Sequence, residues 1–258
     1  MLLREALDVG GSALVAAVGA GGKTTLLQRL ATELAATGAC VISTTTTAIW
    51  EPDGHVVIEE DAHALLDRVS ALVGRGRVLT VARRRHFEAT ASGGDAPAKL
   101  RGVDVTLPAR LLALNGVDYV LVEADGGRGR AIKAPAAHEP VIPPQATLVL
   151  AVAGIDALGQ PLTGEIAHRP ELLASLLGIQ PGALLTPRHI AALLAHARGG
   201  HKAVPQTARF VPFINKVQDE ASLLGARAIA ARLRGQPGVD RVVIGAALSS
   251  RPVLEVWQ

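Results

Sequence analysis

Residues 13–31 read ALVAAVGAGGKTTLLQRLA, and this stretch decides the fold class. Its apolar, partly β-branched beginning predicts a buried strand over Ala13–Val18, and a glycine-rich turn follows at once. Apolar residues then recur at the spacing of one helix face, which predicts an amphipathic helix over Thr24–Ala36. A buried strand that passes through a tight turn into a helix is the first unit of an α/β fold.

Similar apolar, β-branched runs recur along the rest of the chain and alternate with helical patterns. The runs predict strands over Ala39–Ser43, Arg77–Val81, Tyr119–Glu123, Thr147–Val152, Arg209–Ile214, Arg241–Ile244 and Val253–Trp257. The helical patterns cover Ala62–Val73, Glu171–Leu177, Pro187–Ala197 and Glu220–Leu233. We therefore expect one α/β domain over residues 1–258, with a mostly parallel sheet and helices on both faces. Residues 83–108 and 126–145, which contain Gly-Gly pairs and prolines, read as long functional loops or a small insertion.

Composition narrows the class of protein further. Apolar residues make up 49% of the chain and charged residues 19%, which is enough for a packed core and excludes global disorder. No apolar run approaches the roughly 18 residues of a membrane span, and charged residues interrupt the N-terminus, so we expect a cytoplasmic protein without a membrane partner. The single cysteine, Cys40, excludes an intramolecular disulfide and a cysteine-rich metal site. A net charge of +3 is too small to indicate nucleic-acid binding.

The glycine-rich turn has the composition of a phosphate-binding loop. Small residues let backbone N–H groups surround an anion, and the N-terminus of the following helix adds a favourable partial charge. In such loops a lysine, here Lys23, reaches the outer phosphates and a hydroxyl, here Thr24, ligates Mg²⁺. The full pattern GxxxxGK[ST] has glycine where this chain has Ala17, a position that mostly shapes the turn. The loop therefore predicts a fold like that of the P-loop NTPases and a nucleotide site at Gly19, Ala20, Gly21, Gly22, Lys23, Thr24 and Thr25.

Two acidic residues follow a predicted central strand in YVLVEADGG, residues 119–127. Glu123 ends the strand, and Asp125 lies two positions on, on the same face if the strand continues. P-loop sites use such an acid to hold Mg²⁺ or its waters. We assign Glu123 to the metal shell, and Asp125 either to that shell or to orientation of the attacking group. The alternative is a carboxylate pair that caps the next turn.

Hydroxyl residues follow the second predicted strand, at Ser43–Thr47. A hydroxyl at a strand end, such as Thr45, can provide a further Mg²⁺ ligand or contact a γ-phosphate. Threonine's β-propensity together with helix capping explains the run equally well.

Asn215 and Lys216 end another predicted strand, in RFVPFINKVQD. In P-loop GTPases the pattern NKxD at this place reads guanine through its aspartate. Here the fourth position is Gln218, and the acid follows at Asp219. Asn215 and Lys216 are therefore candidates to flank a purine, and the bound nucleotide is ATP or GTP.

The order of these segments resembles the YqeC family, whose members are described as accessory proteins of selenium-dependent molybdenum hydroxylases. The resemblance spans Val18 to Gln218 and includes Gly-Gly-Lys-Thr-Thr, Thr44–Thr47, Glu123-Ala-Asp125-Gly126, Lys133–Pro143, His168-Arg169-Pro170 and Asn215-Lys216. It implies a cytoplasmic, nucleoside-triphosphate-binding protein that serves maturation of a molybdenum enzyme. A molybdenum hydroxylase or its maturation proteins are the partners that it implies.

Cationic and polar residues in two of these segments are candidates for a second ligand. They are Lys133, His138, Glu139, His168 and Arg169. Cations beside a triphosphate could hold a small anionic substrate such as a phosphate, carboxylate or oxyanion. Hydrogen bonds that pin a long loop are an equally natural role for the same residues.

Together the motifs predict a Mg²⁺-dependent P-loop nucleotide hydrolase or phosphoryl-transfer enzyme with a second anionic ligand. Lys23 would neutralise γ-phosphate charge, Thr24 and Glu123 would hold Mg²⁺, and Asp125 would position the nucleophile. Two alternatives stay open. One is a nucleotide-gated chaperone or carrier with slow hydrolysis. The other is an ATP-dependent ligase or kinase that acts on a small acid.

Overall fold

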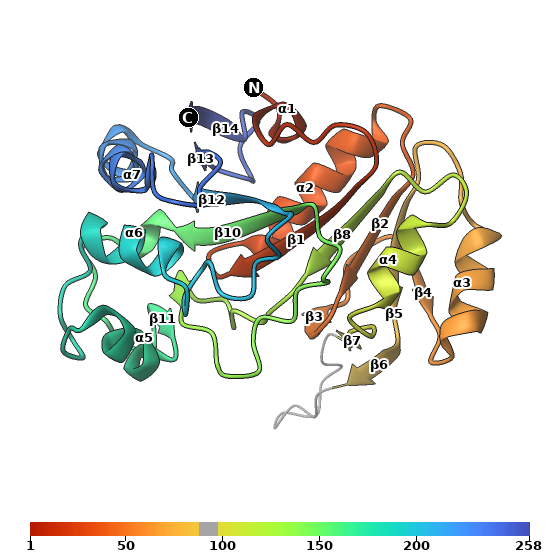
Figure 1. Cartoon of the computed structure of the whole chain (residues 1–258), viewed down its shortest axis with the longest axis horizontal. Coiled ribbons are helices and arrows are strands. Elements are labelled where there is room, and N and C mark those ends of the chain that lie inside the picture. Colours follow the sequence, from red (N-terminus) through yellow and green to blue (C-terminus); the bar gives the residue numbers. More distant parts are fainter. Residues whose placement is uncertain (88–97) are drawn as a thin grey trace.

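A computed structural model describes residues 1–87 and 98–258 of the chain. Its centre is a twisted sheet (Figure 1), in which nine of the described strands pair. In spatial order these are β14 (Val253–Trp257), β13 (Val242–Gly245), β12 (Arg209–Asn215), β10 (Leu148–Gly154), β1 (Ala13–Gly19), β8 (Tyr119–Glu123), β2 (Val41–Thr45), β5 (Val78–Ala82) and β4 (His55–Ile58). The pairs are parallel from β13 to β4, and β14 runs antiparallel to β13. The expected mostly parallel sheet is confirmed.

Helices cover both faces of this sheet, as the sequence predicts. Along β1, Leu14, Ala16 and Val18 belong to one apolar cluster, and the alternate residues Val15 and Ala17 belong to the other. Short α1 (Leu3–Ala6) and long α2 (Lys23–Ala35) pack against the second face. The first face is covered by α3 (Ala62–Ser70), α4 (Leu107–Leu112), α5 (Pro170–Leu177), α6 (Pro187–Ala195) and α7 (Glu220–Leu233), and a 3-10 turn, η1, covers Ile155–Ala157.

The segments that read as loops contain short strands that sequence patterns did not reveal. In the first segment β6 (Arg84–Phe87) and β7 (Ala98–Arg101) form a three-stranded antiparallel sheet with β3 (Ala48–Trp50). In the second, β9 (Ile132–Lys133) pairs in parallel with β11 (Ala167–His168). Residues 88–97 of the first segment lie outside the described part of the chain.

The topology brings the candidate segments to one edge. Strand β1 lies between β8 and β10, and Ala17 is the register partner of Glu123. Gly154, at the end of β10, pairs with Asn215 at the end of β12. Parallel strands bind ligands at their carboxyl ends, and all of these ends face the loop after β1. In the described residues no helix combines the length and the apolar character that a membrane crossing requires.

Candidate functional site

Glycine is required in the loop between β1 and α2. Gly21 and Gly22 have φ of +88° and +108°, which L-residues with side chains rarely adopt. A Cβ on Gly21 would lie 2.2 Å from the backbone nitrogen of Gly154, and one on Gly22 would lie 2.6 Å from Asn215 Nδ2. Ala17, where the sequence departs from the GxxxxGK[ST] pattern, lies inside β1 before the turn begins, so its methyl group leaves the loop unchanged.

The loop divides into a closed first half and an open second half. The first N–H groups donate to protein oxygens: Gly19 to Asp125 Oδ2 at 3.1 Å, Ala20 to Val152 O at 3.1 Å and Gly21 to Arg130 O at 2.9 Å. The amides of residues 22–25 have no acceptor within the described part of the chain. They stand at the N-terminus of α2, where backbone donors and the helix dipole favour an anion. The open half is therefore the part of the loop whose amides are available to an anion.

Lys23 folds back onto its own loop. Its Nζ donates to Gly19 O at 2.6 Å and lies 3.1 Å from Asp125 Oδ1 and 3.6 Å from Glu123 Oε1. Burial alone would lower the pKa of Lys23, but the two carboxylates outweigh it and raise the pKa, so Lys23 is an ammonium. A phosphate at the open amides would compete with Gly19 O for this cation.

Thr24 and Glu123 place two oxygen ligands of the kind that Mg²⁺ binds next to one another. Thr24 Oγ1 donates to Glu123 Oε2 at 2.7 Å, which places a hydroxyl and a carboxylate side by side at the edge of the open amides. Groups of three or more His, Cys, Asp or Glu side chains suited to a metal do not occur in the described residues. A cation held by one carboxylate, one hydroxyl, phosphate oxygens and water needs no such group, and Mg²⁺ is bound in this way.

Thr45, the further metal ligand expected from the sequence, ends strand β2 and is fully buried. Its hydroxyl donates to Glu123 O at 2.8 Å and accepts from the Thr47 N–H at 3.0 Å. The hydroxyl of Thr44 likewise donates to Val81 O. Thr45 thus lies beside Glu123 and braces its backbone, while metal ligation by Thr45 stays a prediction.

The second-ligand candidates form a chain of alternating charges. Lys133 Nζ lies 3.0 Å from Asp125 Oδ2 and 2.8 Å from Glu139 Oε2. Arg169 Nη1 continues the chain, 2.6 Å from the same Glu139 oxygen. Because Arg169 and Lys133 donate to Glu139, the pKa of this carboxyl falls to about 2 although burial opposes the shift. The described carboxylates thus neutralise the cations that we expected to hold a second anion.

Neither histidine side chain of that group forms a hydrogen bond within the charge chain in the described residues, although His168 is the register partner of Lys133. His138 is exposed. His168 is half-buried on β11, and its pKa falls to about 4 because of burial and because Arg169, Lys133 and Arg128 repel a proton. It is therefore neutral near pH 7 and adds no positive charge. The structure brings together Lys133, Glu139 and Arg169, and it does not add His138 to them.

Asn215 ties the loop to the sheet. Its Nδ2 donates to Gly21 O at 2.8 Å, and its Oδ1 accepts from the Ala247 N–H at 3.0 Å. Lys216 pairs with Asp156 at 2.6 Å. Asp219 caps helix α7 by accepting from the Ser222 N–H at 2.7 Å. Asn215 thus has a structural role, and purine contact by Asn215 and Lys216 stays a prediction.

A cavity of about 360 Å³ lies over the loop and is rich in cations. Besides the loop residues and Glu123, it is lined by Trp50, Lys99, Arg128, Arg130 and Lys216. Lys99 Nζ stands 4.3 Å above the Trp50 ring. Arg128 is exposed and has no hydrogen-bond or ion-pair partner in the described part of the chain. Of these residues the sequence singles out Lys216, whereas Trp50, Lys99, Arg128 and Arg130 are new. For the two arginines the available signal was their position between glycines directly after the acidic strand.

The relatives agree with the resemblance seen in the sequence. A family model described as YqeC protein matches residues 15–171, which include the loop, the acidic pair and the charge chain as far as Arg169. The YqeC protein of Escherichia coli (strain K12) is 37% identical over 205 residues, which are 79% of this chain and 75% of that protein. Asn215 and Lys216 lie beyond the residues that the family model matches. The chain therefore belongs to the YqeC family.

Proposed function

We propose that this protein binds a nucleoside triphosphate with Mg²⁺ and hydrolyses it or transfers its terminal phosphoryl group. One observation carries the proposal: the unpartnered amides of residues 22–25 stand next to the Thr24 hydroxyl, which contacts Glu123 at 2.7 Å. Anion donors and a magnesium-type oxygen pair thus meet at one edge of the sheet.

The cation fits this site through its oxygen chemistry. Thr24 and Glu123 would hold Mg²⁺, and the bound ion would neutralise negative charge on the phosphates. The rest of the electrostatic work falls to the chain's own cations. The Lys23 ammonium would donate to a phosphate oxygen instead of to Gly19 O. Asp125 would keep Lys23 protonated and close to the loop. Because the site is largely buried, such charges act more strongly than they would in water.

Asp125 and Lys23 have different roles in the proposed site. Asp125 Oδ2 accepts from the Gly19 N–H, and its Oδ1 faces Lys23 without a hydrogen bond of good geometry in the described residues. We therefore infer that Asp125 is first a positioning residue for the loop and for Lys23. Orientation of the attacking group is the further role that we propose for it once Lys23 has moved to phosphate.

The first experiment is calorimetry with non-hydrolysable ATP and GTP analogues. Lys23→Ala should weaken triphosphate binding by about 10- to 100-fold, the range of a charge-assisted hydrogen bond, and leave binding of the bare nucleoside unchanged. Near-ultraviolet circular dichroism checks that the variant is folded. Equal triphosphate affinity of the folded variant and the wild type would refute the nucleotide site.

The second experiment separates the metal role from packing. Glu123→Gln keeps the shape and can still accept from the Thr24 hydroxyl, and Asp125, at 3.1 Å, remains as the nearer carboxylate partner of Lys23. The variant should therefore stay folded, with a far smaller relative change in the free energy of unfolding than in Mg²⁺-dependent hydrolysis. Glu60→Gln, which removes an exposed carboxylate distant from the loop, is the matched control. Equal activity of Glu123→Gln and wild type across a Mg²⁺ titration would remove Glu123 from the metal site.

We further propose that the nucleotide cycle serves maturation of selenium-dependent molybdenum hydroxylases. Membership of the YqeC family and the resemblance described above support this context. Deletion of the gene in a host that makes such a hydroxylase should lower hydroxylase activity, and Lys23→Ala should fail to restore it. Stimulation of hydrolysis by a small molecule would favour an enzyme, and stimulation by a partner protein alone would favour a nucleotide-gated carrier.

A further inference from the structure

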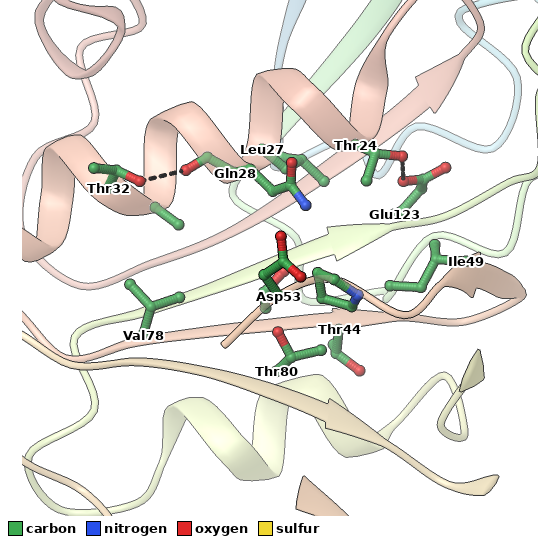
Figure 2. Close-up of a pocket in the computed structure, with 13 residues that line it drawn as sticks. Thr24, Leu27, Gln28, Thr32, Thr44, Ile49, Asp53, Val78, Thr80 and Glu123 are labelled. Atoms are coloured by element: carbon green, nitrogen blue, oxygen red, sulfur yellow. Dashed lines mark hydrogen bonds between the residues drawn. The ribbon is translucent and has the colours of Figure 1, made fainter. Parts of the chain in front are cut away.

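A second cavity, of about 320 Å³, lies between helix α2 and strands β2 and β5 (Figure 2). Thr24, Ile49 and Glu123 line both this cavity and the cation-rich cavity of about 360 Å³ over the loop, which is called the phosphate-side cavity below. Anything bound here would therefore lie on the other side of the proposed metal residues from the loop amides.

The cavity presents polar groups that are not used by the protein. Ser43, Thr80, Gln28 and Asp53 have no side-chain hydrogen bond or ion pair in the described residues. Thr80 is only 6% exposed as a residue, and its unpartnered hydroxyl lines the cavity, where a bound molecule could form a hydrogen bond with it. In Figure 2 the Gln28 amide and the Asp53 carboxylate point toward one another from opposite walls.

The charged residues that line this cavity are acidic, whereas those of the phosphate-side cavity are mostly basic. Asp53 and Glu123 line this cavity, and none of its described lining residues is Lys, Arg or His. The phosphate-side cavity is lined by Lys23, Arg128 and further cations. A carboxylate wall disfavours an anion and favours a neutral or cationic molecule. Leu27, Ile49, Pro52 and Val78 add apolar surface for a hydrocarbon part of the ligand.

We propose that this cavity binds the protein's second ligand, a small molecule with amino or hydroxyl groups and no anionic group. Asp53 and Gln28 would recognise its polar end at the rim, and Ser43 and Thr80 would satisfy hydroxyl or amino groups at the floor. The position of the ligand beside a terminal phosphate rests on the proposed nucleotide function. The charge preference of the cavity does not rest on it. An anionic second ligand at Lys133 and Arg169 would instead have to displace Glu139.

Matched probes test the charge preference. Tyramine and 3-(4-hydroxyphenyl)propionate share a phenol and differ in carrying an amine or a carboxylate. Ligand-observed NMR titration should give tighter binding of tyramine by about fivefold or more, the factor that one exposed ion pair supplies. Asp53→Asn should bring the ratio close to one, and Asp67→Asn, which removes an exposed carboxylate on α3, should leave it unchanged.

Thr80→Val tests the site itself, because it keeps the shape and removes the unpartnered hydroxyl. It should weaken binding of both probes together, since both carry a phenol. Binding of neither probe to the wild type, equal binding of both, or titrations that Asp53→Asn and Thr80→Val leave unchanged would each overturn the proposal.

Two further measurements separate this proposal from the nucleotide function. Lys23→Ala should lose triphosphate binding and retain the preference for tyramine. With Mn²⁺ and a non-hydrolysable triphosphate bound to the wild type, paramagnetic relaxation of the tyramine protons should increase, because the cavity shares Thr24 and Glu123 with the metal site. If the triphosphate does not bind but tyramine does, the nucleotide function fails and the cavity proposal stands. If the triphosphate binds and tyramine relaxation does not change, the placement of the second ligand is wrong.

Discussion

Lys133 Nζ lies 3.0 Å from Asp125 Oδ2, and both side chains are almost fully buried. The same Asp125 oxygen accepts from the Gly19 N–H, and its other oxygen faces Lys23. Strand β9, which carries Lys133, is thereby joined to the loop between β1 and α2 through one carboxylate. A substitution of Lys133 should therefore change the conformation or stability of the loop through Asp125, and not through direct contact with a nucleotide.

The first prediction concerns this ion pair. Lys133→Met keeps a long unbranched side chain but removes the cation that the buried carboxylates Asp125 and Glu139 share, so that each retains only one cation, Lys23 or Arg169. Removal of one partner from a buried ion pair typically costs about 3–5 kcal/mol. We expect a loss of this order in the free energy of unfolding, measured by urea denaturation near neutral pH.

Lys202→Met is the matched control for that substitution. Lys202 Nζ also reaches the loop before Glu139, but it donates to the carbonyl oxygens of Ala136 and Ala137 and is paired with no described carboxylate. Its removal should cost about 1 kcal/mol. Equal unfolding curves for the two variants would show that the buried pair does not hold the loop.

The second prediction concerns Arg128, which lines the cation-rich cavity and has no partner in the residues described. A guanidinium that is free in the absence of ligand is suited to contact phosphate charge as it develops. Arg128→Ala should lower kcat of hydrolysis by about 10³-fold, the lower range for an arginine that stabilises phosphoryl transfer, with little change in triphosphate affinity. Steady-state kinetics and calorimetry on the same samples separate the two effects.

Arg130→Ala is the comparison, because Arg130 lines the same cavity while its guanidinium donates to Glu165 O at 3.2 Å. We expect a much smaller change in kcat for this variant. If Arg128→Ala hydrolyses at the wild-type rate, the guanidinium does not contact the reacting phosphate.

The central strands and long helices could be predicted from the sequence because burial and periodicity are local signals. Strand β8 and helix α7 have the expected bounds, Tyr119–Glu123 and Glu220–Leu233. Strand β2 extends two residues beyond the expected end at Ser43, because the backbones of Thr44 and Thr45 continue to pair with β8. Their hydroxyls also donate to the neighbouring strands. Threonine does not reveal from the sequence whether it ends a strand or continues it.

The remaining features depend on partners that are distant in the sequence. The short strands β3, β7 and β9 are too brief for an alternating pattern, and pairing with other segments defines them. The sequence identifies Lys133 as a candidate ligand-binding residue. Its ion pair with Asp125 could not be predicted, because it depends on how the fold brings β9 next to the segment after β8. In the same way, the residue types Asn215 and Lys216 suggest base recognition, whereas the contact of Asn215 with Gly21 requires β12 to end beside the loop.

The third prediction concerns the base. Gln218 is exposed and lines a cavity of about 530 Å³ after β12, and Asp219 there is engaged as a helix cap. Without a free carboxylate at position 218, discrimination between bases should be weak or favour adenine. Gln218→Asp should shift the ratio of affinities toward the GTP analogue by about 1 kcal/mol, the net contribution of a hydrogen bond at an exposed position. Competition binding with both analogues measures the ratio.

Asp219→Asn provides the comparison, because asparagine also caps helices and should leave the ratio unchanged. Strong preference of the wild type for GTP that Asp219→Asn abolishes would assign the reading of guanine to Asp219 and contradict the prediction.

The last prediction concerns the pH dependence of stability. The pKa of His168 falls from an ordinary 6.5 to about 4, chiefly through burial and then through repulsion by Arg169 and Lys133. A depressed pKa in the folded state means that the unfolded chain takes up this proton first as the pH falls. The contribution of His168 is therefore complete above pH 6.5 and is lost as the pH falls from 6.5 toward 4. The carboxyl of Glu139 acts in a lower window, from its ordinary 4.5 down to about 2.

His168→Gln removes the titrating ring and retains a polar side chain. Between about pH 7 and about pH 5 the wild type should lose about 1 kcal/mol more of its free energy of unfolding than the variant, with solvent screening at this half-buried site allowed for. Urea denaturation at both pH values gives the difference, and NMR of the histidine ring gives the pKa directly. Arg169→Met should raise that pKa, because it removes the cation that repels the proton most strongly. A His168 ring that titrates near 6.5 in the wild type would show that these cations do not lower its pKa. The wild type and His168→Gln would then lose the same free energy of unfolding between the two pH values.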